Sequence, residues 1–176
     1  MNIKEIPKEG KKLNIKKDSA WFMNMVGDSN IDIEFLAEDM TSNLDVHLTQ
    51  TRSIVIEGSI YADVVLQCVK CLSLFHKVVD TTFTVVLEPY DLSAPIRHAI
   101  AKAELDAEFY VNDEFDPEVV VFEQIMLNLP MYPLCKPDCK GLCMYCGANL
   151  NEEPSHNCNK GHNISLFRSQ LERIIK

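Results

Sequence analysis

Long apolar runs and the common catalytic motifs are both missing from this sequence of 176 residues. No stretch approaches the roughly 18 apolar residues of a membrane-spanning helix. The first residues lack the apolar core of a signal peptide, so we expect a cytosolic protein without a membrane contact. The phosphate-binding and dinucleotide-binding glycine motifs, His-Glu-x-x-His, the zinc-deaminase signature and the Gly-x-Ser-x-Gly elbow do not occur. These absences argue against an enzyme and against a small-molecule substrate.

The composition is that of a globular protein, but the charge is unevenly distributed. Hydrophobic residues make up 47% of the chain and charged residues 24%, so the chain can bury a core. The net charge is -9: residues 1–17 carry +4, residues 18–130 carry -15 and residues 131–176 carry +2. A polyanion would be repelled by the middle and accepted only at the ends. The acidic middle is either a solvated surface or a surface for a basic partner such as a ribosomal protein.

Apolar residues alternate with polar ones over much of residues 31–87, which predicts strands. The alternation covers residues 31–35, 44–48, 54–66 and 74–87, and a further strand is expected at 105–111. Residues 88–103 contain two prolines and predict a loop, with a short helical turn at 97–103.

Two helices are expected near the C-terminal end of the chain. Asp116 and Pro117 suit the cap and first position of a helix near 117–129. Its expected core face comprises Val119, Phe122, Ile125, Met126 and Leu129. The tail 163–176 has the pattern of an amphipathic helix that either docks on the fold or binds RNA or a partner. The sequence therefore predicts a mostly antiparallel β domain with a covering helix (1–130), a Cys-rich segment (131–162) and a C-terminal helix (163–176), α+β overall.

Seven cysteines give the strongest chemical signal, and five of them lie between residues 135 and 158. An odd number of cysteines and no secretion signal favour metal ligation over disulfides. The core is Cys143-Met144-Tyr145-Cys146-Gly147, the form of a zinc knuckle, in which a glycine with positive φ follows the second thiol. We expect a structural zinc ion held by four of six candidate ligands: Cys135, Cys139, Cys143, Cys146, Cys158 and His156.

The remaining pair, Cys68 and Cys71, lies at the expected turn between two long strands. Three interpretations stay open: half of a second metal site, a redox pair, or a structural turn. A thioredoxin-like redox pair should open a helix, whereas a strand is expected here.

The cysteine segment forms a longer pattern with its neighbours: Leu129, Pro130, Cys139, Lys140, Gly141, Leu142, Cys143, Cys146, Gly147, Asn149, Leu150 and Asn151. This pattern resembles the YceD family, the large ribosomal RNA subunit accumulation proteins. Cys68-Val69-Lys70-Cys71-Leu72 is similar to the family's Cys-x-Arg-Cys-Leu, with Lys70 in place of Arg. Where the family often ends the block with Cys-x-Cys, this chain has His156-Asn157-Cys158, so a Cys₃His site is one outcome.

The resemblance implies a bacterial or plastid-type, non-catalytic factor that supports 23S ribosomal RNA accumulation and large-subunit assembly. Its partners would be ribosomal RNA or large-subunit assembly intermediates. Direct RNA contact would use the basic ends, at Lys11, Lys12, Lys16, Lys17, Lys140 and Arg168. Two alternatives are a thiol-based redox switch that releases zinc on oxidation and a metal-dependent hydrolase acting on RNA.

Overall fold

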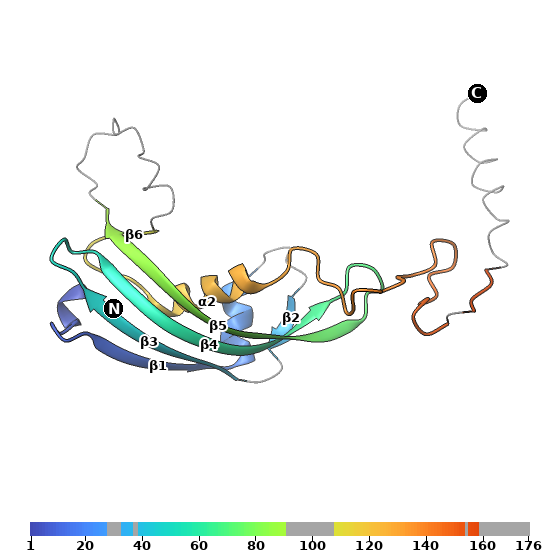
Figure 1. Ribbon diagram of the computed structural model, residues 1–176, viewed down its shortest axis with the longest axis horizontal. Coiled ribbons are helices and arrows are strands. Elements are labelled where there is room, and N and C mark those ends of the chain that lie inside the picture. The colour runs from blue at the N-terminus through green and yellow to red at the C-terminus, as the bar shows by residue number, and fades with distance from the viewer. Residues whose placement is uncertain (28–32, 37–38, 91–107, 154, 159–176) are drawn as a thin grey trace, which may run out of the picture. The chain divides into compact units, whose positions relative to one another are not determined.

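The computed structural model describes residues 1–27, 33–36, 39–90, 108–153 and 155–158 (Figure 1). The expected helix at 163–176, with Arg168, and the expected turn at 97–103 lie outside these residues. No helix of the described residues is long and apolar enough to cross a membrane.

The chain divides into two compact units. Unit 1 comprises Met1–Val65 and His76–Pro130, and unit 2 comprises Leu66–Phe75 and Met131–Lys176. The short segment 66–75 lies in the part of the sequence that we assigned to the β domain, but it groups with the Cys-rich segment.

Six strands of the described residues form one sheet with the order β1-β3-β4-β5-β6, and β2 pairs with β4. The strands are β1 (Lys11–Lys17), β2 (Ile33–Leu36), β3 (Met40–Leu48), β4 (Ile54–Gln67), β5 (Leu74–Pro89) and β6 (Glu108–Tyr110). The β1–β3 and β3–β4 pairs are antiparallel, whereas β6 runs parallel to β5. The strand-dominated α+β class expected from the sequence is confirmed.

The period-two pattern places the core on one face of the sheet. In β4, the side chains of Ile54, Ile56 and Ile60 are buried. In the register of the β3–β4 pair, Val46 lies opposite Ile56, and both are fully buried. Because successive side chains of a strand point to opposite faces, this alternation fixes which face carries the core.

The helix α2 (Pro117–Asn128) begins where the sequence predicts, with the Asp116 carboxylate accepting the Glu118 N–H at 2.9 Å. Its core face was predicted incorrectly in part: Val120, Val121 and Ile125 are buried, whereas Val119 is 37% exposed. Three consecutive valines allow more than one apolar face, and tertiary packing selects among them.

Two further elements were not assigned from the sequence: the strand β1 and the helix α1 (Ser19–Val26). The Asp18 carboxylate caps α1 by accepting the Trp21 N–H at 2.9 Å. Phe22 packs on Phe122 of α2 with ring centroids 5.6 Å apart. Both helices lie on the same side of the sheet (Figure 1). A short 3-10 helix, η1 (Ile3–Glu5), precedes β1.

Candidate metal centres

Four cysteines of unit 2 form a first cluster, Cys68, Cys71, Cys135 and Cys139, whose sulfur atoms all lie within 4.8 Å of one another. The Cys68 and Cys139 Sγ atoms are 3.7 Å apart, and those of Cys71 and Cys135 are 3.6 Å apart. A disulfide would need about 2.05 Å. Four thiolates held tetrahedrally at about 2.3 Å from one zinc ion would be about 3.8 Å apart. The observed spacing therefore fits a four-thiolate metal site.

The turn after β4 presents the first pair of thiols. The Leu72 N–H donates to the Cys68 carbonyl at 2.9 Å, and Leu72 adopts a φ of 58°. The Val69 N–H donates to the Pro133 carbonyl at 3.0 Å. These bonds hold the 68–71 turn against the segment that supplies the other two thiols.

The second cluster consists of Cys143, Cys146, His156 and Cys158, whose ligand atoms also lie within 4.8 Å of one another. The Cys146 Sγ atom is 3.2 Å from His156 Nε2. His156 Nδ1 lies 3.1 Å from a Glu153 carboxylate oxygen. Metal-binding histidines usually donate one ring N–H to such a carboxylate, which leaves the other nitrogen for the ion. The arrangement fits a three-thiolate, one-imidazole site.

The two cysteine pairs are held by the same local geometry. In the second cluster, the Gly147 N–H donates to the Cys143 carbonyl at 2.8 Å, and Gly147 has a φ of 77°. This repeats the Leu72 to Cys68 bond of the first cluster. The positive φ expected after Cys146 is confirmed, and the same conformation occurs after Cys71, where the residue is leucine.

Hydrogen bonds from Asn151 and Leu142 support the first cluster. The Asn151 side-chain amide donates to Cys139 Sγ at 3.4 Å, and its oxygen accepts the Lys140 N–H at 3.0 Å. The Leu142 N–H donates to the Lys70 carbonyl at 3.0 Å. A substitution of Asn151 can therefore affect the first ligand set.

Thiol ionisation differs within the clusters. Burial raises the pKa of Cys68, but backbone hydrogen bonds, that of Cys135 foremost, outweigh it and bring the pKa to about 6. Backbone hydrogen bonds from Tyr145 and Cys146 lower the pKa of Cys143 to about 6, against the effect of burial. Burial and the neighbouring thiols raise the pKa of Cys135 to about 12. Without metal, the first cluster thus combines a readily ionised thiol, Cys68, with a protonated one, Cys135.

The pKa of His156 is raised, first by its hydrogen bond with Cys143 and then by Glu153, against the effect of burial. The pKa of Cys139 is lowered because the Asn151 amide and the backbone outweigh its burial. A metal cation bound to His156 Nε2 or to the Cys139 thiolate would take the place of the proton on that atom.

The structure places the candidate ligands in two sites of four, whereas the sequence suggested one complete site. The sequence left six candidates for one site and left Cys68 and Cys71 open as half of a second site, a redox pair or a structural turn. In the structure, Cys135 and Cys139 join Cys68 and Cys71, and His156 completes the second set. Every cysteine of the chain belongs to one of the two clusters.

Sequence reasoning gave no role to two residues around the clusters, Asn151 and Glu153. Asn151 appeared only as part of the family resemblance. The spacing Glu153-x-x-His156 was the available signal, because a carboxylate three residues before a histidine can reach its ring.

Several of the lysines expected to contact RNA are paired within unit 1. Lys17 Nζ lies 2.6 Å from a Glu118 oxygen, and Lys12 lies 3.7 Å from Asp45. Lys11 lies 3.6 Å from Glu5. Lys16 and Lys140 are exposed, the latter in unit 2 beside Cys139.

Comparison with known proteins bears on the same segments. The sequence profile of the family described as "Large ribosomal RNA subunit accumulation protein YceD" matches residues 56–171. This range contains all eight ligands of the two clusters. The chain belongs to the YceD family.

The relatives of this chain include mycobacterial and plant proteins. An uncharacterized protein of Mycobacterium tuberculosis is 31% identical over 131 residues, 73% of this chain and 61% of that protein. The "Large ribosomal RNA subunit accumulation protein YCED homolog 1, chloroplastic" of Zea mays is 42% identical over 63 residues, 36% of this chain and 21% of that protein. The match thus spans about three fifths of the mycobacterial relative's length. No solved structure matches this YceD chain.

Proposed function

We propose that this YceD protein is a non-catalytic cytosolic factor that supports 23S ribosomal RNA accumulation and large-subunit assembly, with a structural zinc ion in each cluster. The family assignment and the name of the Zea mays relative support the ribosomal role. The partners we propose are ribosomal RNA or large-subunit assembly intermediates.

The observation that carries a structural role for the metal is the completeness of both ligand sets. Each cluster offers four ligand atoms of the kind that zinc prefers, four sulfurs in one and three sulfurs with one nitrogen in the other. A zinc ion with four protein ligands has no position left for an activated water. Catalytic zinc sites keep such a position open. The chemistry that zinc supplies here is cross-linking of the chain.

The test is ribosome assembly in cells that carry a cluster variant. We expect Cys146→Ser to lower the 23S RNA level and to accumulate large-subunit precursors in a sucrose gradient. Met144→Ser is the matched control, because Met144 lies between the same two cysteines and is 87% exposed. Unchanged 23S RNA in both the Cys146→Ser strain and a deletion strain would overturn the proposal.

Direct contact with the assembling particle is tested in the same gradient. Co-migration with large-subunit precursors that is lost as salt rises would support electrostatic binding to RNA. Lys140→Gln should weaken that co-migration, because Lys140 is exposed in unit 2. Migration at the top of the gradient at every salt concentration would count against direct contact.

A thiol switch is the second candidate function, and the sulfur pairs 3.6 and 3.7 Å apart favour it. A peroxide would take two electrons from such a pair, form a disulfide and expel the metal. The burial of Cys68, at 0% exposure, opposes rapid reaction. Slow alkylation and no zinc release from the native protein treated with hydrogen peroxide would exclude this function.

A further inference from the structure

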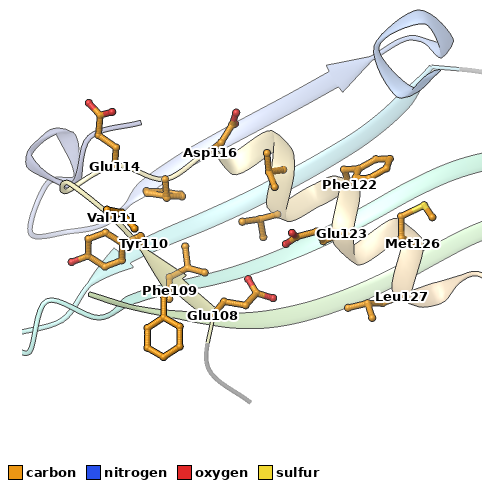
Figure 2. Close-up of a pocket in the computed structure, with 14 residues that line it drawn as sticks. Glu108, Phe109, Tyr110, Val111, Glu114, Asp116, Phe122, Glu123, Met126 and Leu127 are labelled. Atoms are coloured by element: carbon orange, nitrogen blue, oxygen red, sulfur yellow. The ribbon is translucent and has the colours of Figure 1, made fainter. Parts of the chain in front are cut away.

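A groove in unit 1 lies between β6 and α2 (Figure 2). None of the residues that line it is a ligand of the metal clusters. It encloses about 810 Å³. Apolar side chains that remain exposed line it: Phe109 is 49% exposed, Val119 37% and Leu127 73%. Exposed apolar side chains that gather at a groove indicate a binding surface more than scattered ones do.

The charged residues that line the groove are all acidic: Glu108, Glu114, Asp116 and Glu123. Asp116 is used as the cap of α2. Among the ion pairs of the described residues, none involves Glu108, Glu114 or Glu123. The groove therefore carries a negative charge that the described part of the chain does not neutralise.

The carboxylates next to those of the groove, by contrast, have cationic partners. Asp113 pairs with Arg52, and Glu118 pairs with Lys17. Among the described residues of unit 1, Arg52 and Lys17 thus pair with acidic residues that do not line the groove, and no cation pairs with Glu108, Glu114 or Glu123. The contrast argues that a cation from outside the described chain completes the groove.

Two of the unpaired carboxylates affect each other. Figure 2 shows the Glu108 and Glu123 side chains reaching into the space between β6 and α2. Burial and the charge of Glu123 raise the pKa of Glu108. A lysine or arginine placed between them would relieve this repulsion.

We propose that the groove binds a polypeptide segment of a partner protein in which basic and apolar side chains are interspersed. Apolar side chains of the segment would cover Phe109, Val119 and Leu127, and its cations would meet Glu108 and Glu123. RNA does not suit the groove, because its phosphates would face unpaired carboxylates. The choice of a basic partner rests on the proposed role in ribosome assembly, because proteins that bind ribosomal RNA are basic.

The test is fluorescence anisotropy of a labelled 16-residue peptide of alternating lysine and leucine, titrated with the full-length zinc-loaded protein. The same peptide with glutamate in place of lysine is the charge control. We expect the Glu108→Gln, Glu123→Gln double variant to weaken binding at least tenfold at low salt and less at high salt. Leu127→Ser should weaken it about fivefold at both salt concentrations.

Matched control variants separate the groove from general attraction to an acidic protein. Glu57→Gln with Asp80→Asn removes two exposed carboxylates outside the groove, and Val78→Ser removes an apolar side chain that is 47% exposed on β5. Neither control should change the affinity more than twofold. Equal losses in the groove and control variants, or no binding at all, would overturn the proposal.

Other occupants give different results in the same experiments. Binding of a 20-nucleotide RNA that Leu127→Ser abolishes would replace the proposal with an RNA site. Self-association in analytical ultracentrifugation that Leu127→Ser abolishes would make a second copy the occupant. Tighter peptide binding in Arg168→Glu would make the basic tail the occupant. Normal peptide binding with no effect on 23S RNA in a deletion strain would retain the groove and remove the ribosomal role.

Discussion

Removal of the metal should unfold unit 2 and leave unit 1 folded. The core of unit 2 contains thiols in place of large apolar side chains: Cys68 is 0% exposed, and Cys71 and Cys139 are 5% exposed. Among the described residues, the apolar side chains packed against these three thiols besides Cys135 are Phe75, Leu134 and Leu142, all partly buried. Each would contribute at most about 1.5–3 kcal/mol if fully buried. A structural zinc ion contributes of the order of 10 kcal/mol, so the metal dominates.

The assay combines limited trypsin digestion with tryptophan fluorescence, before and after addition of EDTA. Lys140 lies in the metal-binding segment and is followed by Gly141, so we expect cleavage there only after metal removal. Trp21 is the one tryptophan of the chain and lies in unit 1, where its Nε1 donates to Glu118 at 3.0 Å. Its emission should stay unchanged.

Metal content gives the control for this experiment. Elemental analysis should find two zinc ions in the wild-type chain and one in either Cys71→Ser or Cys146→Ser, since each variant removes a ligand from one cluster. Resistance to trypsin at Lys140 in fully metal-free protein would refute the reasoning.

Three further predictions concern single contacts. Asn151→Ala and Glu153→Gln should each lower the zinc affinity about 10–100-fold, because Asn151 orients Cys139 and Glu153 orients His156. Competition with a chromogenic chelator measures this affinity, and an unchanged value would remove the orienting role. The pKa of Cys143 is lowered to about 6, so its thiolate persists above that pH. We therefore expect zinc to be retained at neutral pH and released as the pH falls below about 6. Release of zinc already above pH 7 would contradict this. Gly58→Ala should lower the free energy of unfolding of unit 1 by about 1–3 kcal/mol in chemical denaturation, because the new Cβ would lie 2.6 Å from the Phe83 ring; an unchanged midpoint would show that the ring moves freely.

Local patterns predicted the regular elements with strong periodicity or strong caps. The alternation through Ile54 and Ile56 predicts a strand, and Asp116-Pro117 predicts the start of a helix, because both signals act within a few residues. The helix α1 has a cap at Asp18 but spans only eight residues, too few for a clear apolar period. The strand β1 alternates only at Leu13 and Ile15, and four of its seven residues are lysines, so the apolar period is too short to predict a strand.

The sequence by itself determined that this chain can bind metal through its thiols, and it showed which thiols form pairs on a single turn. Two residues between Cys143 and Cys146, or between Cys68 and Cys71, bring each pair to one ion through local geometry alone. Only the tertiary structure decided that Cys135 and Cys139 complete the site of Cys68 and Cys71, and that His156 belongs to the other. Sequence spacing cannot decide this, because the partners are more than 60 residues apart and meet only when the β4–β5 turn packs on the Cys-rich segment.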